Sequence, residues 1–552
     1  MSLPKAILCV ILSALSLSLG IPNELLPGSS ILLGFAALVP LYTLLRSTRS
    51  WSLAAVYGGF MMMSVHLISS FWLAYFKEFA IFTLGASALA YLVMGLLAGW
   101  LLKYSLSFPS HLRPFVFAAV WTVWEWFKSI GFLAYPWGTL MMSAPHVKSL
   151  IQIADITGAW GVSFLIALCS SVCAELLAQN RFRPFSLLPV YRSLLFTAFV
   201  LLLTLTYGNM RLSTLPASEE SINVVLVQQN TDPWDEPNAE VPLLVSQRLT
   251  REAILNSPVK PDLVIWSESV LPWPYQEYRN HYALFPRSDP FRAFLSEIDT
   301  PLLVGAPVLV NRERKEYANS VILLSPDGKK SDWYGKIQLV PFAEYMPFTE
   351  YAWVRKTFDT LVGFSSGWQP GTEFKSLSVK TRDGRNISFA TPICFEDAFA
   401  SHVARLYRTG SSLLINLTND SWSKTDSAEM QHYAIASFRA IELRTTLIRS
   451  TNAGYSAVID PAGTILYDMP LFTEAAISAN VPIYRHGLTF YARFGDWLPT
   501  LFALLLAVLF AYKAILDILA SRTLTYNNKW LTRITHATQN TGFLTFSDYD
   551  RD

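Results

Sequence analysis

Charged side chains are scarce in this chain of 552 residues: only 15% are Asp, Glu, Lys or Arg, whereas 52% are hydrophobic and 14% are aromatic. This composition is too apolar for an ordinary soluble protein and places the chain in the membrane class. The formal net charge of +2 at pH 7 gives no support for a nucleic-acid partner. The length indicates more than one domain.

Cysteine is equally rare, with only four residues in the chain. Cys9, Cys169 and Cys173 lie in long apolar stretches, so Cys394 is the one thiol in the polar part of the sequence. It ends an apolar, strand-like run, and the carboxylate of Glu396 follows two residues later. Cys394 has no obvious disulfide partner, so we interpret it as a reactive thiol, with an inert buried thiol as the alternative.

Long apolar runs gather at the front of the chain, and one more comes late. About 20 apolar residues are needed for a helix to cross a bilayer, and most of the runs reach that length. In the first run an apolar core follows Lys5, which also fits a signal peptide, but the further runs close behind it favour a retained helix. We therefore predict eight membrane helices, at residues 4–21, 30–45, 53–76, 79–102, 114–133, 156–177, 191–207 and 494–519.

Lys and Arg are divided unevenly between the loops that join these runs. If the N-terminus is cytoplasmic, most of them fall on the cytoplasmic side, which is the positive-inside pattern. This orientation places residues 208–493 on the outer face of the membrane. The predicted parts are a transmembrane domain at 1–207, an extracytoplasmic domain at 208–493, a membrane helix at 494–520 and a polar cytoplasmic tail at 521–552.

The region from 221 to 482 shows alternating strand and helix patterns. The candidate strands are rich in Val, Ile and Leu and mostly continuously apolar, as expected for strands covered on both faces. A helix is predicted at 428–444, and the order of elements predicts an α/β sandwich. The strands are predicted at 222–228, 263–266, 301–305, 320–325, 387–393, 412–417 and 456–460.

Polar side chains follow several of these strands. Glu268 comes after the strand at 263–266, Lys336 follows the run 331–334, and Cys394 ends the strand at 387–393. Since α/β folds usually place reacting groups at strand ends, these residues are candidates for a general base, an oxyanion stabiliser and a nucleophile. Each signal is weak alone, because a Glu or a Lys in a loop is most often a solvated residue.

Longer motifs accompany these three residues, namely Trp266-Ser267-Glu268, Tyr334-Gly335-Lys336, VPFAEY at 340–345, ICFE at 393–396, NLTNDSW at 416–422, Gln431-His432, FRAIE at 438–442, RSTN at 449–452 and IDPAG at 459–463. Together they resemble the nitrilase, or carbon-nitrogen hydrolase, superfamily, and nearly the whole chain resembles its membrane branch, the apolipoprotein N-acyltransferases. The resemblance implies a multi-pass helical membrane domain joined to a nitrilase-like αββα sandwich. Phe395 stands where that family often has Tyr, a departure that leaves the triad intact.

The resemblance also implies an activity. A fatty acyl chain would move from a membrane phospholipid to the N-terminal α-amine of a diacylglyceryl-cysteine apolipoprotein, through a thioester on Cys394. Glu268 would be the base and Lys336 the oxyanion partner, without a cofactor or a metal ion. The implied setting is the bacterial inner membrane, with the catalytic domain facing the periplasm and the lipid bilayer as a partner.

Further residues take their roles mainly from the resemblance. Glu344 is a candidate ion-pair partner of Lys336, and the backbone N–H of Phe395 is a candidate second oxyanion donor. Glu396 is a candidate for holding the loop after the nucleophile. Trp234 resembles a tryptophan near the substrate, with ordinary packing as the alternative.

Two loops are more apolar than an extramembrane surface requires, and exposed apolar clusters mark binding sites or membrane contact. We predict a lid that dips into the outer leaflet and admits lipid substrates, with Trp353 and Phe364 in contact with them. Packing on the domain core is the alternative. The loops are 271–275 and the segment that holds Tyr351, Trp353, Phe358, Leu361, Val362, Phe364 and Trp368.

Three other polar residues each allow two interpretations. Glu125 and Lys128 are three apart and face one way on a helix, which favours a structural tie or a contact with a phospholipid head group. His432 is a candidate base for a Cys–His pair, but Glu268 already supplies one, so a structural histidine on a helix is the preferred interpretation.

Two other functions remain as alternatives. A membrane-tethered amidase of the nitrilase type would use the same triad with water as the acceptor. A transporter with an accessory domain requires polar groups in several helices, and the sequence offers few beyond Glu125, Lys128 and His66.

Overall fold

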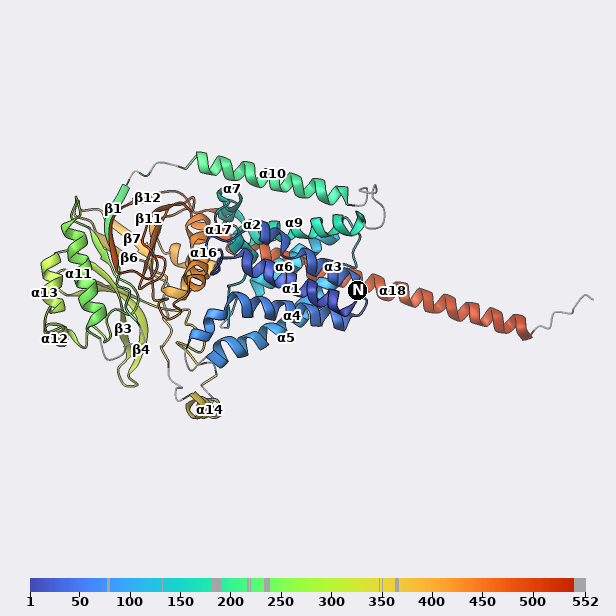
Figure 1. Ribbon diagram of the computed structural model, residues 1–552, viewed down its shortest axis with the longest axis horizontal. Coiled ribbons are helices and arrows are strands. Elements are labelled where there is room, and N and C mark those ends of the chain that lie inside the picture. Colours follow the sequence, from blue (N-terminus) through green and yellow to red (C-terminus); the bar gives the residue numbers. More distant parts are fainter. Residues whose placement is uncertain are drawn as a thin grey trace, which may run out of the picture. The chain divides into compact units, whose positions relative to one another are not determined.

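The computed structural model describes residues 1–76, 80–131, 133–180, 190–215, 218, 220–232, 239–346, 348–349, 351–362 and 367–540 (Figure 1). Met1–Pro499 form one compact unit, and Thr500–Asp552 form a second. The first unit holds the N-terminal helices and two β-sheets.

Apolar helices make up the N-terminal part of the first unit. Within the described residues, six helical segments are long and apolar enough to cross a membrane. This confirms the multi-pass helical class. The segments are Leu3–Gly20 (α1), Trp51–Ser69 (α4), Thr83–Ser105 (which includes α5, Ser87–Ser105), Ala159–Ala178 (in α9, Ala159–Asn180), Tyr191–Ser213 (α10) and Trp497–Leu519 (in α18, Trp497–Asn540).

Two predicted membrane helices are shorter than expected. The run at 30–45 splits into α2 (Ile31–Ala36) and α3 (Val39–Ser47), because Pro40 lies in the first turn of α3 and has no N–H to continue a preceding helix. The run at 114–133 forms α6 (Arg113–Phe127), which is only 15 residues long. The prediction of eight membrane-length helices is therefore not confirmed.

Helices α4 and α5 approach each other closely. A Cβ atom on Gly58 would lie 2.3 Å from the Cα atom of Gly99, so a larger residue at Gly58 would force the helices apart. Small residues allow membrane helices to pack in this way. The short elements that join the helices are η1 (Phe71–Tyr75), η3 (Ile81–Ala86), η4 (Leu140–Ser143), α7 (Lys148–Ile151), α8 (Ala154–Thr157) and α17 (Phe490–Phe494).

The second unit contains most of α18. The apolar stretch of this helix ends at Leu519, and the helix continues through polar residues to Asn540. The predicted polar tail at 521–552 is therefore helical over its described residues.

Residues after the N-terminal helices form two six-stranded sheets, ordered β12-β1-β2-β3-β4-β5 and β11-β10-β9-β8-β7-β6. The pairs β1–β2, β2–β3, β7–β8 and β8–β9 are parallel. The carboxyl ends of β2, β7 and β8 therefore carry the loops on which α/β folds place their chemistry. The strands are β1 (Glu220–Gln228), β2 (Leu263–Ile265), β3 (Leu302–Asn311), β4 (Glu316–Leu324), β5 (Lys330–Gly335), β6 (Leu377–Lys380), β7 (Asn386–Ala390), β8 (Leu413–Thr418), β9 (Leu447–Thr451), β10 (Ala457–Ile459), β11 (Ile465–Asp468) and β12 (Ala475–Ile483).

Side chains of β1 show how the layers pack. Ile222, Val224 and Leu226 belong to the apolar core shared with the second sheet. Val225 and Val227 belong to a separate core under the helices of the first sheet. Successive side chains of a strand point to opposite faces, so both faces are covered and the αββα sandwich is confirmed. The covering helices are α11 (Val241–Leu255), α12 (Arg279–Tyr282) and α13 (Phe291–Ile298) on the first sheet, and α15 (Ala400–Tyr407) and α16 (Asp426–Leu443) on the second.

Helix α16 lies between the second sheet and the N-terminal helices (Figure 1). The side-chain amide of Gln431 donates to the carbonyls of Pro22 and Ser69, both at 2.9 Å. The Glu442 carboxylate accepts from the backbone N–H of Ala159 at 2.9 Å. The predicted helix at 428–444 is confirmed, and it joins the sandwich to the N-terminal helices.

Candidate active site

Cys394 lies just past β7, where the chain turns toward α15. Ile393 bridges to β8, and Cys394 then adopts a left-handed backbone conformation (φ +47°) at the start of a 3₁₀ turn. A non-glycine residue in this conformation costs about 1 kcal/mol or more. The Asn416 amide stabilises the turn by donating to the carbonyls of Pro392 (3.0 Å) and Cys394 (3.3 Å). The sharp turn leaves the thiol partly buried at the edge of the sheet.

Glu268 follows β2 and is almost fully buried. Its Oε1 accepts from the side-chain amide of Asn319 at 2.7 Å and from Lys336 Nζ at 3.2 Å. Its Oε2 accepts from the backbone N–H of Asn419 at 3.0 Å. A Cβ atom on Gly305 would lie 2.6 Å from the Glu268 Cα, so only glycine fits on the neighbouring strand. These contacts hold the carboxylate in one orientation.

Lys336 follows β5 and is also buried, at 1% exposure. Its ammonium donates to Glu344 at 2.9 Å as well as to Glu268. Glu344 in turn accepts from the Asn319 amide at 2.8 Å and from the backbone N–H of Val340 at 2.9 Å. The predicted ion pair between Glu344 and Lys336 is therefore present, and Asn319 bridges the two carboxylates.

The charges around the thiol set its resting state. Burial raises the pKa of Cys394 well above its usual range, and the nearby Glu268 adds to this. Burial likewise raises the pKa of Glu268, against the lowering effect of Lys336. Burial alone would lower the pKa of Lys336, but Glu268 and Glu344 more than reverse this, so the ammonium stays charged. The resting site holds a neutral thiol, a basic carboxylate and a fixed cation, which suits proton transfer at the moment of attack.

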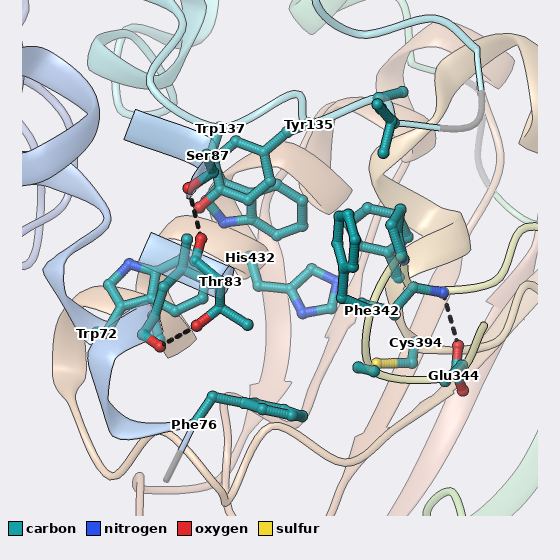
Figure 2. Close-up of a pocket in the computed structure, with 18 of the residues that line it drawn as sticks. Trp72, Phe76, Thr83, Ser87, Tyr135, Trp137, Phe342, Glu344, Cys394 and His432 are labelled. Atoms are coloured by element: carbon teal, nitrogen blue, oxygen red, sulfur yellow. Dashed lines mark hydrogen bonds between the residues drawn. The ribbon is translucent and has the colours of Figure 1, made fainter. Parts of the chain in front are cut away.

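Cys394, Glu268 and Lys336 all line one cavity of about 630 Å³. Figure 2 shows Cys394 in this cavity. The opposite wall comes from the N-terminal helices and their connections, and it is largely aromatic. Trp72, Phe76, Tyr135 and Trp137 lie there in Figure 2. Apolar walls with a few convergent polar groups are typical of small-molecule sites. This cavity therefore connects the membrane-type helices with the thiol.

Phe395 and Glu396 fix the turn that carries the thiol. The Phe395 ring stacks on Trp137, with centroids 5.5 Å apart and planes 9° apart. The Glu396 carboxylate accepts from the backbone N–H groups of Ile393 (2.8 Å) and Ile337 (2.7 Å), so it ties the Cys394 turn to the loop after Lys336. Burial alone would raise the pKa of Glu396, but nearby His402 and the backbone N–H groups of Ile393 and Gln338 lower it.

Comparisons with known proteins cover both the N-terminal helices and the sandwich. A family model described as "Apolipoprotein N-acyltransferase N-terminal domain" matches residues 13–172, and one described as "Carbon-nitrogen hydrolase" matches residues 224–488. The "Apolipoprotein N-acyltransferase 2" of Treponema denticola is 49% identical over 90% of this chain and 95% of its own. The "Apolipoprotein N-acyltransferase" of Borreliella burgdorferi is 34% identical over 88% of this chain and 92% of its own.

The chain belongs to the apolipoprotein N-acyltransferase family. Among solved structures, a carbon-nitrogen hydrolase from Helicobacter pylori G27 matches 48% of this chain and 89% of its own, with 17% identity and a TM-score of 0.34. Within the described residues, no group of three or more His, Cys, Asp or Glu side chains is arranged to hold a metal ion.

The residues predicted to contact substrate, Trp234 among them, and those predicted to form the lid have different outcomes. Trp234 and Phe364 lie outside the described residues. Trp353 lies on α14 (Ala352–Val362) and is 73% exposed. The prediction of an exposed apolar loop at 271–275 is wrong for Leu271 and Tyr275, which are buried in the core under the first sheet. The Tyr275 ring packs against Tyr282 of α12 and Phe291 of α13.

Glu125, on α6, and Lys128, at the C-terminal end of that helix, make their hydrogen bonds to other groups. The Glu125 carboxylate accepts from the indole N–H of Trp121 (2.8 Å) and from the backbone N–H of Leu140 (2.7 Å). Lys128 donates to the carbonyl oxygens of Tyr135 and Trp137 instead. Both residues thus bind the segment after α6, which fits the structural interpretation, and Lys128 also lines the cavity.

Two residues of the site were not given their place in it from the sequence. Asn319, in the apolar strand β4, was not predicted, although a single Asn in such a strand is a signal for a buried polar contact. His432 was predicted to be structural, yet it lines the cavity beside Cys394 (Figure 2). Neither position reveals its partner from the sequence alone.

Proposed function

We propose that this chain transfers a fatty acyl group from a membrane phospholipid to the N-terminal α-amine of a diacylglyceryl-cysteine apolipoprotein. The acyl group is carried as a thioester on Cys394. The observation that supports this most is the shared cavity, because it joins Cys394, Glu268 and Lys336 to an aromatic wall built on membrane-type helices. A lipid that enters from the bilayer would meet the thiol there.

The first half-reaction forms the thioester. Glu268 takes the thiol proton of Cys394 as the sulfur attacks the ester carbonyl of the phospholipid. Lys336 and the backbone N–H of Phe395 stabilise the oxyanion. The C–O bond then breaks, Glu268 returns the proton to the departing alkoxide, and the lysophospholipid leaves.

The second half-reaction uses the same groups. The lipoprotein amine attacks the thioester carbonyl, and Glu268 accepts the proton that the amine loses. The C–S bond breaks, the proton passes to the Cys394 sulfur, and the N-acylated product leaves. Since the two substrates react in turn at one thiol, the kinetics are ping-pong.

A membrane-tethered amidase would use the same triad but would deliver the acyl group to water. The aromatic and apolar side chains of the cavity wall favour a lipid substrate over a small amide. The relatives named above also carry the acyltransferase name rather than an amidase name. Product analysis separates the two: lysophospholipid with N-acyl peptide in one case, ammonia with free acid in the other.

The orientation forms part of the proposal. The uneven distribution of Lys and Arg supports an orientation with the sandwich on the periplasmic side of the bacterial inner membrane. A membrane-impermeant amine reagent should label lysines of the sandwich, such as Lys424, in spheroplasts. Labelling only in inverted vesicles would contradict this orientation.

The function is tested with full-length protein, phospholipid and a diacylated lipopeptide. Cys394→Ala should abolish acyl transfer, and Cys394→Ser should reduce it severely, while Cys173→Ala serves as a matched control on an apolar helix. Full activity of both Cys394 variants would overturn the proposal.

A further inference from the structure

A buried group of charges lies directly behind the candidate nucleophile. The Cys394 Sγ is 3.9 Å from Asp420 Oδ1, and the other oxygen of Asp420 is 2.9 Å from His432 Nδ1. The second ring nitrogen, His432 Nε2, is 2.7 Å from Asp397 Oδ1. His432 thus bridges two carboxylates, one of which touches the thiol.

Arg449 completes the group from β9. It pairs with Asp397 and lies 3.9 Å from Asp420. The side chains of His432, Asp397 and Arg449 are 0–4% exposed, and that of Asp420 is 11% exposed. Buried carboxylates are costly unless cations pair with them, so the charges in this group must balance.

The geometry sets the protonation of His432. Both ring nitrogens face carboxylate oxygens, so both must carry a proton in order to donate, and the ring is an imidazolium. Burial alone would lower the pKa of His432, but Asp420 and Asp397 raise it to about 10. Burial and the nearby Asp420 raise the pKa of Glu429, which also lies close by, well above its usual range. Two carboxylates are thus matched by one imidazolium and one guanidinium.

We propose that His432 is a positioning residue. Its fixed positive charge offsets the negative charge of Asp420 and thereby makes it easier for the Cys394 thiol to ionise. This rests on the proposed role of Cys394. Without His432, sulfur would have to acquire negative charge beside a carboxylate whose remaining cation, Arg449, lies 3.9 Å away. His432 is not a base for the thiol, because neither ring nitrogen is free to accept a proton.

Coulomb effects distinguish this role from simple packing. A like charge a few ångströms away shifts a neighbouring pKa by about one unit, which lowers the thiolate fraction about tenfold at neutral pH. Neutralising Asp420 as well should reverse the effect. A packing defect would instead persist or grow in the double variant.

The test measures alkylation of Cys394 by iodoacetamide at neutral pH in the full-length protein, quantified by mass spectrometry of the peptide that contains Cys394. His432→Gln should react about tenfold more slowly than the unchanged protein. Asp420→Asn should react faster, and His432→Gln with Asp420→Asn should recover to within about threefold of the original rate.

An unchanged rate in His432→Gln, or a double variant as slow as His432→Gln, would overturn the proposal. If His432→Gln fails to fold, Asp420→Asn still tests the proposal. Cys394 should be alkylated faster in that variant, so a slower or unchanged alkylation rate would contradict the proposal. Acyl transfer by Cys394→Ala is measured in parallel, in order to test the proposed function of Cys394 separately. Activity in that variant would refute the role of Cys394 itself.

Discussion

The ammonium of Lys336 lies 3.2 Å from Glu268 Oε1 and 2.9 Å from Glu344 Oε1, and all three groups are nearly enclosed by protein. One cation therefore serves two carboxylates. A second bridge, the side-chain amide of Asn319, donates to the same two carboxylates. This arrangement keeps one carboxylate basic while holding a positive charge at the cavity wall.

Replacing Lys336 with Met removes the cation while keeping most of the side-chain volume. Acyl-enzyme formation should slow by about 10²–10³-fold, since one oxyanion donor contributes about that much. The measurement is the single-turnover rate of lysophospholipid release. Lys329→Met, at a lysine that is 72% exposed, is the matched control and should retain full activity. A normal rate in Lys336→Met would remove Lys336 from the mechanism.

Asn319→Asp places a third carboxyl group against Glu268 and Glu344. An added negative charge raises the pKa of Glu268 further, and burial has already raised it above its usual value. Because Glu268 must be ionised to act as the base, the acid limb of kcat/KM should move to higher pH by about one unit. An acid limb at the original pH would show that Glu268 does not control it.

Glu396→Gln tests the tie between the Cys394 turn and the loop after Lys336. The folded-state pKa of Glu396 is below its ordinary value of 4.5, so its ionised form stabilises the fold above that pH. That contribution is lost as the pH falls through the folded-state pKa. The variant should lose about 3 kcal/mol of its free energy of unfolding at neutral pH. Its stability should also fall less steeply than that of the unchanged protein as the pH is lowered.

Thermal unfolding in detergent at neutral pH and below pH 4.5 provides the measurement for Glu396. Glu252→Gln, at a carboxylate that is 54% exposed, is the control and should be nearly neutral. Equal melting temperatures for Glu396→Gln and the unchanged protein would show that this tie does not stabilise the turn.

Trp353 is 73% exposed on α14, and a lid that enters the bilayer requires such a residue. Trp353→Ser should raise KM for phospholipid several-fold, because an exposed aromatic side chain contributes about 1 kcal/mol or more to membrane contact. Alkylation of Cys394 by a small reagent should not change. Val310→Ser, on an exposed part of β3, is the control. Unchanged lipid kinetics would contradict the lid.

Much of the sandwich follows from the sequence, because its central strands are covered on both faces and are continuously apolar. β2 and β8 were predicted for this reason. The edge strand β6 was not, because Leu377 and Val379 are buried while Ser378 and Lys380 are exposed, which leaves no apolar run. β9 was also missed, since Arg449, Ser450 and Thr451 are polar and obtain their partners only from the fold.

The residues of the site were also predictable from the sequence only in part. Glu268, Lys336 and Cys394 were identified by their motifs at strand ends, and the fold brings them to one cavity. The bridge formed by Asn319 was missed because its carboxylate partners lie on other loops. The charge on His432 was also not predictable, since Asp397 approaches it from a different element.

The account depends most on a covalent intermediate. The direct measurement incubates full-length protein with phospholipid and no acceptor, then examines the peptide containing Cys394 by mass spectrometry. We predict the added mass of one acyl chain on that peptide, and its loss when a diacylated lipopeptide is added. Absence of that mass, while the complete mixture still yields N-acylated peptide, would contradict the account.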